Sequence, residues 1–272
     1  MIIAQISDTH VRPPGQLAYG RVDTATLLAR AVDRILAMSP RPDVVLATGD
    51  LVDAGQAEEY RHLRALLAPL PMPVYLIAGN HDERGALARE FGDHAYLPRD
   101  GRFLHYVLEE YPLRLIGLDT LIPGEVRGAM CEERCAWLAE RLAEAPQRPT
   151  MLFMHHAPFV TGIEQMDHYG LDGIERMGAV VSRHAQVERI VCGHLHRPIQ
   201  VRWCGTVVMT APSTAHQVML NLEPGAPLVF AMEPPAFLLH VWREGLGLVT
   251  HTSYVGDFDG PFTSRSGGMR AT

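Results

Sequence analysis

Five short segments rich in Asp, His and Asn each follow an apolar stretch of this sequence. They are Ser7-Asp8-Thr9-His10, Gly49-Asp50, Gly79-Asn80-His81-Asp82, His155-His156-Ala157-Pro158 and Gly193-His194-Leu195-His196. Taken alone, such a segment is more typical of a hydrogen-bonded loop or a helix N-cap. Five of them are hard to reach by chance, and open α/β sheets bind ligands at the carboxyl ends of their strands. The pattern therefore predicts a metal site.

The side chains in these segments indicate which metals would bind. One ion cannot normally use seven ligands, but two ions that share a bridging carboxylate can. Nitrogen and oxygen donors without sulfur suit Mn, Fe, Co or Zn better than Ca or Mg. Two ions about 3.5–4 Å apart are the usual arrangement for in-line displacement at phosphorus. The seven candidate ligands are Asp8, His10, Asp50, Asn80, His155, His194 and His196.

The elements that would position these side chains alternate between strand and helix. The central one is the buried strand at 43–47, which leads to Gly49-Asp50. After about residue 199 the pattern is mainly β, which favours two packed sheets with helices outside. The other expected strands are 2–6, 74–78, 103–108, 113–118, 151–154, 189–192, 200–203, 206–209, 236–242 and 248–254. The expected helices are 25–38, 58–67, 85–91, 132–143 and 174–184.

The chain of 272 residues is long enough for one large α/β domain, and we expect a single domain over 1–272. Within it, 200–256 is a β-rich segment that includes a possible oligomerisation hairpin at about 218–236. The last residues, 257–272, are rich in Gly, Ser and Arg and are expected to be loose.

Composition excludes several classes of protein. A net charge of −7 argues against a surface that coats nucleic acid. No apolar run reaches the roughly 18 residues of a membrane span, and the N-terminus shows no signal-peptide pattern. The four cysteines form no Cys-x-x-Cys pair, so reduced thiols are expected. These features predict a cytoplasmic protein without a membrane partner.

The five segments, in this order and spacing, resemble the motifs of the calcineurin-like metallophosphoesterases over roughly the first 200 residues. The similarity is closest to bacterial glycerophosphodiesterases and class III 3′,5′-cyclic nucleotide phosphodiesterases. The resemblance implies an α/β fold, a four-layer αββα sandwich of two mixed sheets, with the metals at the carboxyl edge of the sheets. Segments outside the metal motifs also resemble this branch: Tyr19-Gly20, Gly55 with Glu58-Glu59-Tyr60, Gln165-Met166-Asp167 and Thr214-Ala215-His216-Gln217-Val218.

The resemblance also implies how the ligands divide between two ions, with Asp50 bridging. Asp8, His10, Asp50 and His196 would hold one ion. Asp50, Asn80, His155 and His194 would hold the other. The family's motif is commonly His-His-Pro-Pro, whereas Ala157 stands here in place of the first proline, so the choice of His155 over His156 stays open.

Other side chains are expected around the two ions. By resemblance, His81 lies near the substrate oxygens as an orienting group or proton donor, and a histidine suits proton transfer near neutral pH. His216 is expected to contact substrate or a metal ligand, and Asn80 to contact substrate as well. Asp82 either holds a motif histidine or caps a helix. His168 is a candidate for the edge of the pocket. His156 is a candidate for contact with substrate. The remaining histidines are expected to be structural or on the surface: His62, His94, His105, His184, His240 and His251.

The activity implied is hydrolysis of small phosphodiesters, 3′,5′-cyclic nucleotides or glycerophosphodiesters, by a metal-bound hydroxide. The alternatives are a non-catalytic scaffold of the same fold, a phosphomonoesterase and a nuclease. We also expect a homodimer or higher even oligomer, in which the hairpin buries Leu220, Leu222, Val229 and Phe230. The alternative is that the hairpin packs on its own domain.

Overall fold

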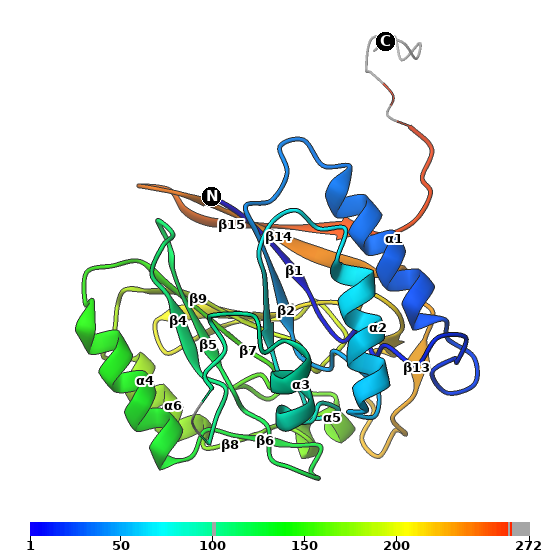
Figure 1. Ribbon diagram of the computed structural model, residues 1–272. Helices are drawn as coiled ribbons and strands as arrows, with labels where there is room; N and C mark the ends of the chain where they lie inside the picture. Colours follow the sequence, from blue (N-terminus) through cyan, green and yellow to red (C-terminus); the bar gives the residue numbers. More distant parts are fainter. Residues whose placement is uncertain (100–101, 261, 263–272) are drawn as a thin grey trace, which may run out of the picture.

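The computed structural model of the chain describes residues 1–99, 102–260 and 262, so most of the predicted loose tail lies outside the described residues. Two mixed β-sheets pack face to face. Helices α1 and α2 cover the outer side of one sheet, and α4 and α6 cover the other (Figure 1). This arrangement confirms the predicted four-layer αββα sandwich.

The first sheet has the strand order β15-β14-β1-β2-β3. Its strands β1, β2 and β3 are parallel, while β14 runs antiparallel to β1 and to β15. The strands are β1 (Ile2–Ile6), β2 (Val44–Thr48), β3 (Val74–Ile77), β14 (Ala236–Arg243) and β15 (Gly247–Tyr254). The helices that precede or follow them are α1 (Thr24–Leu36), α2 (Ala57–Leu67) and α3 (Arg84–Glu90).

The second sheet has the order β10-β11-β9-β7-β5-β4, with β5, β7, β9 and β11 parallel. Its strands are β4 (Tyr106–Leu108), β5 (Arg114–Leu118), β7 (Thr150–Met154), β9 (Val187–Cys192), β10 (Gln200–Trp203) and β11 (Thr206–Thr210). The helices over it are α4 (Glu132–Glu144) and α6 (Ile174–Val181).

Three short elements were not expected from the sequence: α5 (Glu164–His168) and the paired two-residue strands β6 (Gly128–Ala129) and β8 (Leu171–Asp172). A strand of two residues is too short to show an alternating apolar pattern. A second pair of two-residue strands, β12 (Gln217–Val218) and β13 (Phe230–Ala231), lies in the segment where a hairpin was expected.

Helix α1 shows why the sequence forms these elements. Asp23 precedes it, and its carboxylate accepts a hydrogen bond from the Thr26 amide at 3.0 Å, which caps the first turn. Leu28, Val32 and Ile35 recur at helical spacing and are buried against the sheet. The cap therefore sets where the helix begins, and the apolar face sets which side packs against the sheet.

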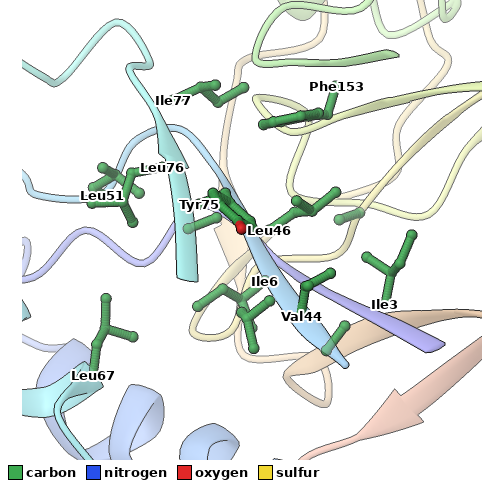
Figure 2. Close-up of a cluster of buried hydrophobic side chains, with 14 of the residues drawn as sticks. Ile3, Ile6, Val44, Leu46, Leu51, Leu67, Tyr75, Leu76, Ile77 and Phe153 are labelled. Carbon is green, nitrogen blue, oxygen red and sulfur yellow. The ribbon is translucent and has the colours of Figure 1, made fainter. Parts of the chain in front are cut away.

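The core between the sheets aligns their carboxyl edges. All five residues of β2 are buried, as expected for a parallel strand covered on both faces. Figure 2 shows Leu46 of the first sheet and Phe153 of β7 in the second sheet within one cluster of buried apolar side chains. Because the parallel strands of each sheet end at one edge, this packing brings the polar strand ends together.

Two sequence expectations about the chain as a whole can be compared with the structure. Among the described residues, no helix is both long and apolar enough to cross a membrane. The four cysteines are free thiols: Cys131, Cys135, Cys192 and Cys204.

Candidate metal centre

Most of the predicted ligands leave their strands in an unusual backbone conformation. Five of the seven have positive φ angles between 42° and 67°: Asp8, His10, Asp50, His194 and His196. For residues other than glycine this left-handed region is sparsely populated. Such strain gathers at functional sites, where the surroundings hold it in place.

Four of the side chains form a first cluster. One nitrogen or oxygen of each of Asp8, His10, Asp50 and His196 lies within 4.8 Å of the others. The Nε2 atoms of His10 and His196 are 3.1 Å apart. His196 Nε2 lies 3.5 Å from Asp8 Oδ1, and His10 Nε2 lies 3.8 Å from Asp50 Oδ2. The four donors converge on one point, as the ligands of one ion would.

A second cluster lies on the other side of Asp50. His155 Nε2 is 3.3 Å from Asp50 Oδ2 and 3.1 Å from Asn80 Oδ1. The same Asn80 oxygen lies 3.0 Å from His194 Nδ1. Asp50 Oδ2 therefore faces both clusters, which is the geometry that a bridging carboxylate requires.

Backbone carbonyls fix the rings of three histidines in these clusters. A carbonyl can only accept, so the ring nitrogen beside it carries the proton and the other nitrogen presents a lone pair to the cluster. The bonds join His155 Nδ1 to Thr48 O at 2.8 Å, His196 Nδ1 to His216 O at 2.9 Å and His194 Nε2 to Tyr169 O at 2.9 Å.

The neighbouring His156 has no free nitrogen for an ion. Its Nδ1 lies 2.8 Å from Thr120 Oγ1, and its Nε2 lies 3.0 Å from the Val126 carbonyl. Both nitrogens are thus used outside the clusters. The geometry favours His155 over His156 as the ligand, and gives His156 the role of holding a loop against it.

Burial and charge prepare the clusters for cations. Asp8 and Asp50 are buried, and Asp8 Oδ2 has no hydrogen-bond partner among the described residues. Burial alone raises the pKa of Asp50, but the nearby imidazoles, His155 first, hold that pKa well below its usual range. Burial lowers the pKa of His194 to about 3 and also lowers the pKa of His196. Metal ligation needs ionised carboxylates and neutral imidazoles. Although burial lowers the pKa of His155, the charge of Asp50 outweighs burial and raises that pKa to about 9, so this ring must release a proton when an ion binds. With that release the donor set fits two ions.

The family of this protein follows from its first 198 residues. A family model described as calcineurin-like phosphoesterase matches residues 1–198. This chain belongs to the calcineurin-like phosphoesterase family. A probable glycerophosphodiester phosphodiesterase of Arcobacter nitrofigilis is 42% identical over 263 residues, covering 96% of each chain. A probable cyclic nucleotide phosphodiesterase of Rhodopseudomonas palustris is 37% identical, covering 95% of this chain and 94% of the relative.

Solved structures share the fold of this calcineurin-like chain. A dimetal phosphatase from Danio rerio aligns with a TM-score of 0.64 at 16% identity, covering 94% of this chain and 99% of that one. A purple acid phosphatase from yellow lupin aligns with a TM-score of 0.65 at 15% identity, covering 88% and 49%. At these identities the likeness concerns the fold alone.

The loop after β3 places His81 beside the clusters. The His81 amide donates to Asp50 Oδ1 at 2.8 Å, and His81 Nδ1 lies 2.7 Å from the Asp53 carbonyl. Burial lowers the pKa of His81, but the charge of Asp50 and the contacts with Asp53 outweigh burial and raise it. The ring edge lies against His10, with centroids 4.6 Å apart.

Both sequence expectations for Asp82 are wrong. Among the described residues, no histidine hydrogen-bonds to its carboxylate, and α3 is capped by Glu83, which accepts from the Gly85 amide at 2.8 Å. Asp82 instead accepts from the amides of Gly79 and Leu51, at 2.8 and 3.1 Å, and so ties its own loop to the end of β2. A carboxylate two residues before a helix cannot be assigned to the cap or to the loop by sequence alone.

A cavity of about 320 Å³ opens over the clusters. His81 and His216 line it together with Asp50, Asn80 and other candidate ligands. His168 does not line it; this side chain lies in a separate hollow beside Arg127. The sequence analysis did not predict an apolar wall for this cavity. The wall comes from loops and from the hairpin: Tyr19, Val126, Met166, Tyr169, Val218, Leu228, Val229 and Phe230.

His216 lies between the first cluster and this wall. Its ring centroid is 4.7 Å from that of His196 and 5.2 Å from those of Tyr19 and Phe230. Burial, followed by the nearby imidazoles, lowers its pKa to about 2. His216 is therefore a neutral ring at the junction of the polar and apolar halves of the cavity.

Most of the remaining histidines are structural, as expected. His62 lies 2.7 Å from the Arg12 carbonyl, and His105 accepts from the Asp119 amide at 2.9 Å. His251 on β15 is exposed. His240 is fully buried and begins a polar chain that ends at the metal centre.

This chain crosses the sandwich. His240 Nδ1 lies 2.9 Å from Thr250 Oγ1, and its Nε2 lies 3.1 Å from Gln5 Oε1. Gln5 Nε2 donates to Thr48 Oγ1 at 3.0 Å, and the carbonyl of Thr48 binds His155. Protonation of His240 would place a positive charge on a ring that is fully buried, near Arg189.

Protonation of His240 should make stability depend on pH. Burial, aided by the charge of Arg189, lowers the folded-state pKa of His240 to about 3. In the unfolded chain the pKa is about 6.5, so the stabilisation is complete above that pH and is lost as pH falls toward 3. Between about pH 8 and about pH 5 the loss should be about 2 kcal/mol. His240→Gln should remove it, as measured by urea unfolding with chelator present.

His251→Gln is the matched control, because it removes an exposed histidine and should leave the pH dependence of unfolding unchanged. An equal pH dependence in wild type and His240→Gln would show that His240 is not held neutral.

Proposed function

We propose that this protein is a phosphodiesterase that uses two metal ions to hydrolyse small phosphodiesters. The observation that carries the proposal is the pair of clusters that share Asp50 Oδ2 at the floor of an open cavity. The names of the relatives support it, since they include glycerophosphodiester and cyclic nucleotide phosphodiesterases. The complete set of donors argues against a non-catalytic scaffold.

We assign one ion to Asp8, His10, Asp50 and His196. The second ion goes to Asp50, Asn80, His155 and His194. When bound, two such ions activate a water and neutralise charge on the phosphoryl oxygens. Nitrogen and oxygen donors favour Mn, Fe, Co or Zn.

His81 is assigned as proton donor to the leaving oxygen. The Asp53 carbonyl fixes its Nδ1–H, so a protonated ring presents Nε2–H toward the cavity. His216, neutral and beside the apolar wall, and the Asn80 amide would orient the substrate. The side chains of the wall exclude water from the ester oxygen.

His81→Ala is expected to lower kcat by about 10²–10⁴-fold, the usual contribution of a positioned proton donor. Both ions should remain bound, because His81 donates to Asp50 only through its backbone amide. Steady-state kinetics and metal analysis measure the two effects. His168→Ala, a histidine in a separate hollow, is the control and should keep full activity. Loss of an ion from His81→Ala would make His81 a ligand instead.

The cavity favours a diester over a monoester. Among the described residues that line it, none is Lys or Arg. The second negative charge of a monoester would therefore meet no cationic side chain beyond the ions. The overall charge of −7 also disfavours a nuclease, which needs a basic track for its substrate.

A substrate panel tests the proposed function. Metal-loaded protein would be assayed on 3′,5′-cAMP, 2′,3′-cAMP, glycerophosphodiesters and a phosphomonoester. We expect hydrolysis of at least one diester class, with the monoester clearly slower. No turnover of any diester by protein that holds two ions would refute the proposal.

We also propose that the chain forms a homodimer or higher even oligomer through the hairpin. Phe230 stacks on Tyr19 of its own chain, with ring centroids 5.0 Å apart. The inner face of the hairpin therefore packs against its own domain. The outer face leaves Leu220 55% and Leu222 62% exposed, and Val229 is 39% exposed. Neighbouring exposed apolar side chains of this kind are typical of an interface.

Replacing both Leu220 and Leu222 by Glu should convert the oligomer to monomers, because a charge buried without a partner disrupts an interface. Light scattering measures the mass. Leu246→Glu is the control, since Leu246 is 65% exposed on the turn between β14 and β15. A monomeric wild type, or a doubly substituted protein that stays assembled, would contradict this interface.

A further inference from the structure

An ion pair connects the Asn80–His81 loop to the second sheet. Arg84, the first residue of α3, donates from Nε to Asp119 Oδ2 at 2.6 Å and from Nη2 to Asp119 Oδ1 at 2.8 Å. Its Nη2 also donates to the Leu121 carbonyl. The side chain of Asp119 is fully buried, and that of Arg84 is 18% exposed. The guanidinium therefore makes a forked, directional contact with a carboxylate that water does not reach.

Asp119 belongs to a loop that also touches the metal centre. It directly follows β5 and accepts hydrogen bonds from the amides of Leu104 and Leu121, at 2.9 and 3.0 Å. The next residue, Thr120, contacts His156 Nδ1, and Val126 in the same loop lines the cavity. Asp119 is thus a fixed anchor on the second sheet.

Arg84 belongs to the loop that carries the amide ligand. Three residues separate it from Asn80, whose oxygen lies between His155 and His194. His155 and His194 follow strands of the second sheet, whereas Asn80 follows β3 of the first. The second ion's position therefore depends on how the two sheets are held relative to each other.

We propose that Arg84 and Asp119 are positioning residues that set the place of Asn80 and His81 for the second ion. This inference rests on the proposed function only in that the cluster of Asn80, His155 and His194 binds an ion. A neutral amide is the weakest donor of the set, so its contribution depends most on placement. The first cluster contains no residue of this loop and meets it only at Asp50, which accepts from the His81 amide, and at His10, which lies against the His81 ring. Its ion should therefore be less sensitive to the pair than the second ion.

The chemistry of the Arg84–Asp119 pair suits a positioning role better than a stabilising one. Burying two charges costs solvation free energy, so a buried ion pair often contributes no more to the free energy of unfolding than an apolar pair would. A planar guanidinium that grips both carboxylate oxygens and a carbonyl fixes direction as well as distance. Lysine, with one compact ammonium group, can keep the charge but not this geometry.

Two variants test the inference. Arg84→Lys keeps the positive charge and loses the paired hydrogen bonds to the two oxygens of Asp119. The double variant Arg84→Gln with Asp119→Asn removes both charges, so that no buried charge is left unpaired. Metal-free protein would be titrated calorimetrically with Mn²⁺ or Zn²⁺, and kcat, KM and thermal unfolding would be measured beside it.

The second ion's Kd should rise about 10–100-fold in both variants, and the first ion's Kd should rise clearly less than the second's. Saturating metal should restore much of kcat. Arg64→Lys is the matched control, because Arg64 grips both oxygens of Asp93 at 2.8 and 2.6 Å on the surface. It should leave both ions and the kinetics unchanged.

If a folded variant binds the second ion with the same Kd as the wild type does, the inference is overturned. So would a uniform weakening of both ions that follows the loss of thermal stability, since that result indicates a purely structural pair. A wild type that binds two ions yet hydrolyses no diester would refute the proposed function and leave this test intact, because its main readout is ion affinity.

Discussion

Asp50→Ala should abolish phosphodiesterase activity and remove at least one of the two ions. The carboxylate is shared by both clusters: its Oδ2 lies 3.8 Å from His10 Nε2 and 3.3 Å from His155 Nε2. Its Oδ1 also accepts from the His81 amide, so the substitution frees the Asn80–His81 loop. Since the two ions would supply most of the charge stabilisation in the reaction, we expect kcat to fall by at least about 10³-fold.

Asp50→Asn separates the loss of charge from the loss of shape. The amide keeps the size of the side chain and can still accept from His81, but it is a poor bridge between two cations. We expect it to hold the loop, to bind fewer than two ions and to stay nearly inactive. Metal analysis of both purified variants decides. Two ions per chain with near-normal turnover in Asp50→Ala would show that another group bridges the ions.

The long elements could be predicted because their apolar periods are set by burial. The strand expected at 43–47 is β2 at Val44–Thr48, and the helix expected at 132–143 is α4 at Glu132–Glu144. The strand ends could be predicted for a related reason. Parallel strands deliver their carboxyl ends to one edge, so Asp and His that follow several such strands meet there.

The walls of the cavity could not be predicted in the same way. The positions of Val126, Tyr169 and Phe230 depend on loops and two-residue strands, whose course is fixed by tertiary contacts and not by local pattern. His168 illustrates this, because one helical turn of α5 turns it away from the cavity.

Asp119 and Thr120 were missed although a signal was present. They are the first and second residues after β5, and Asp50 is likewise the second residue after β2. The sequence does not tell whether such an Asp binds an ion or an arginine. Here Arg84, which is 35 residues away along the chain, makes the difference.

Gly49→Ala should severely damage the metal centre although it removes no ligand. Gly49 has φ +88°, and a Cβ built on it would lie 2.7 Å from His155 Cγ and 2.9 Å from the Gly79 Cα. Neither neighbour can withdraw easily, because His155 is buried and hydrogen-bonded to the Thr48 carbonyl, and Gly79 is backbone. The methyl group must therefore displace His155 or the end of β2. Either displacement would disturb the site of the second ion.

Gly205→Ala is the matched control for this substitution. Gly205 has φ +89°, nearly the same angle, but a Cβ there would meet nothing within 4 Å. Both variants incur the strain of a left-handed alanine, about 1–2 kcal/mol, so their difference isolates the contact with His155. We expect Gly205→Ala to lose only this stability and to keep two ions and full kcat. Gly49→Ala should lose a further 1–3 kcal/mol or so of unfolding free energy and most of its activity. Equal unfolding free energies and equal metal content in the two variants would mean that β2 and His155 can yield without cost, and that the tight approach of Gly49 does not hold the metal centre in place.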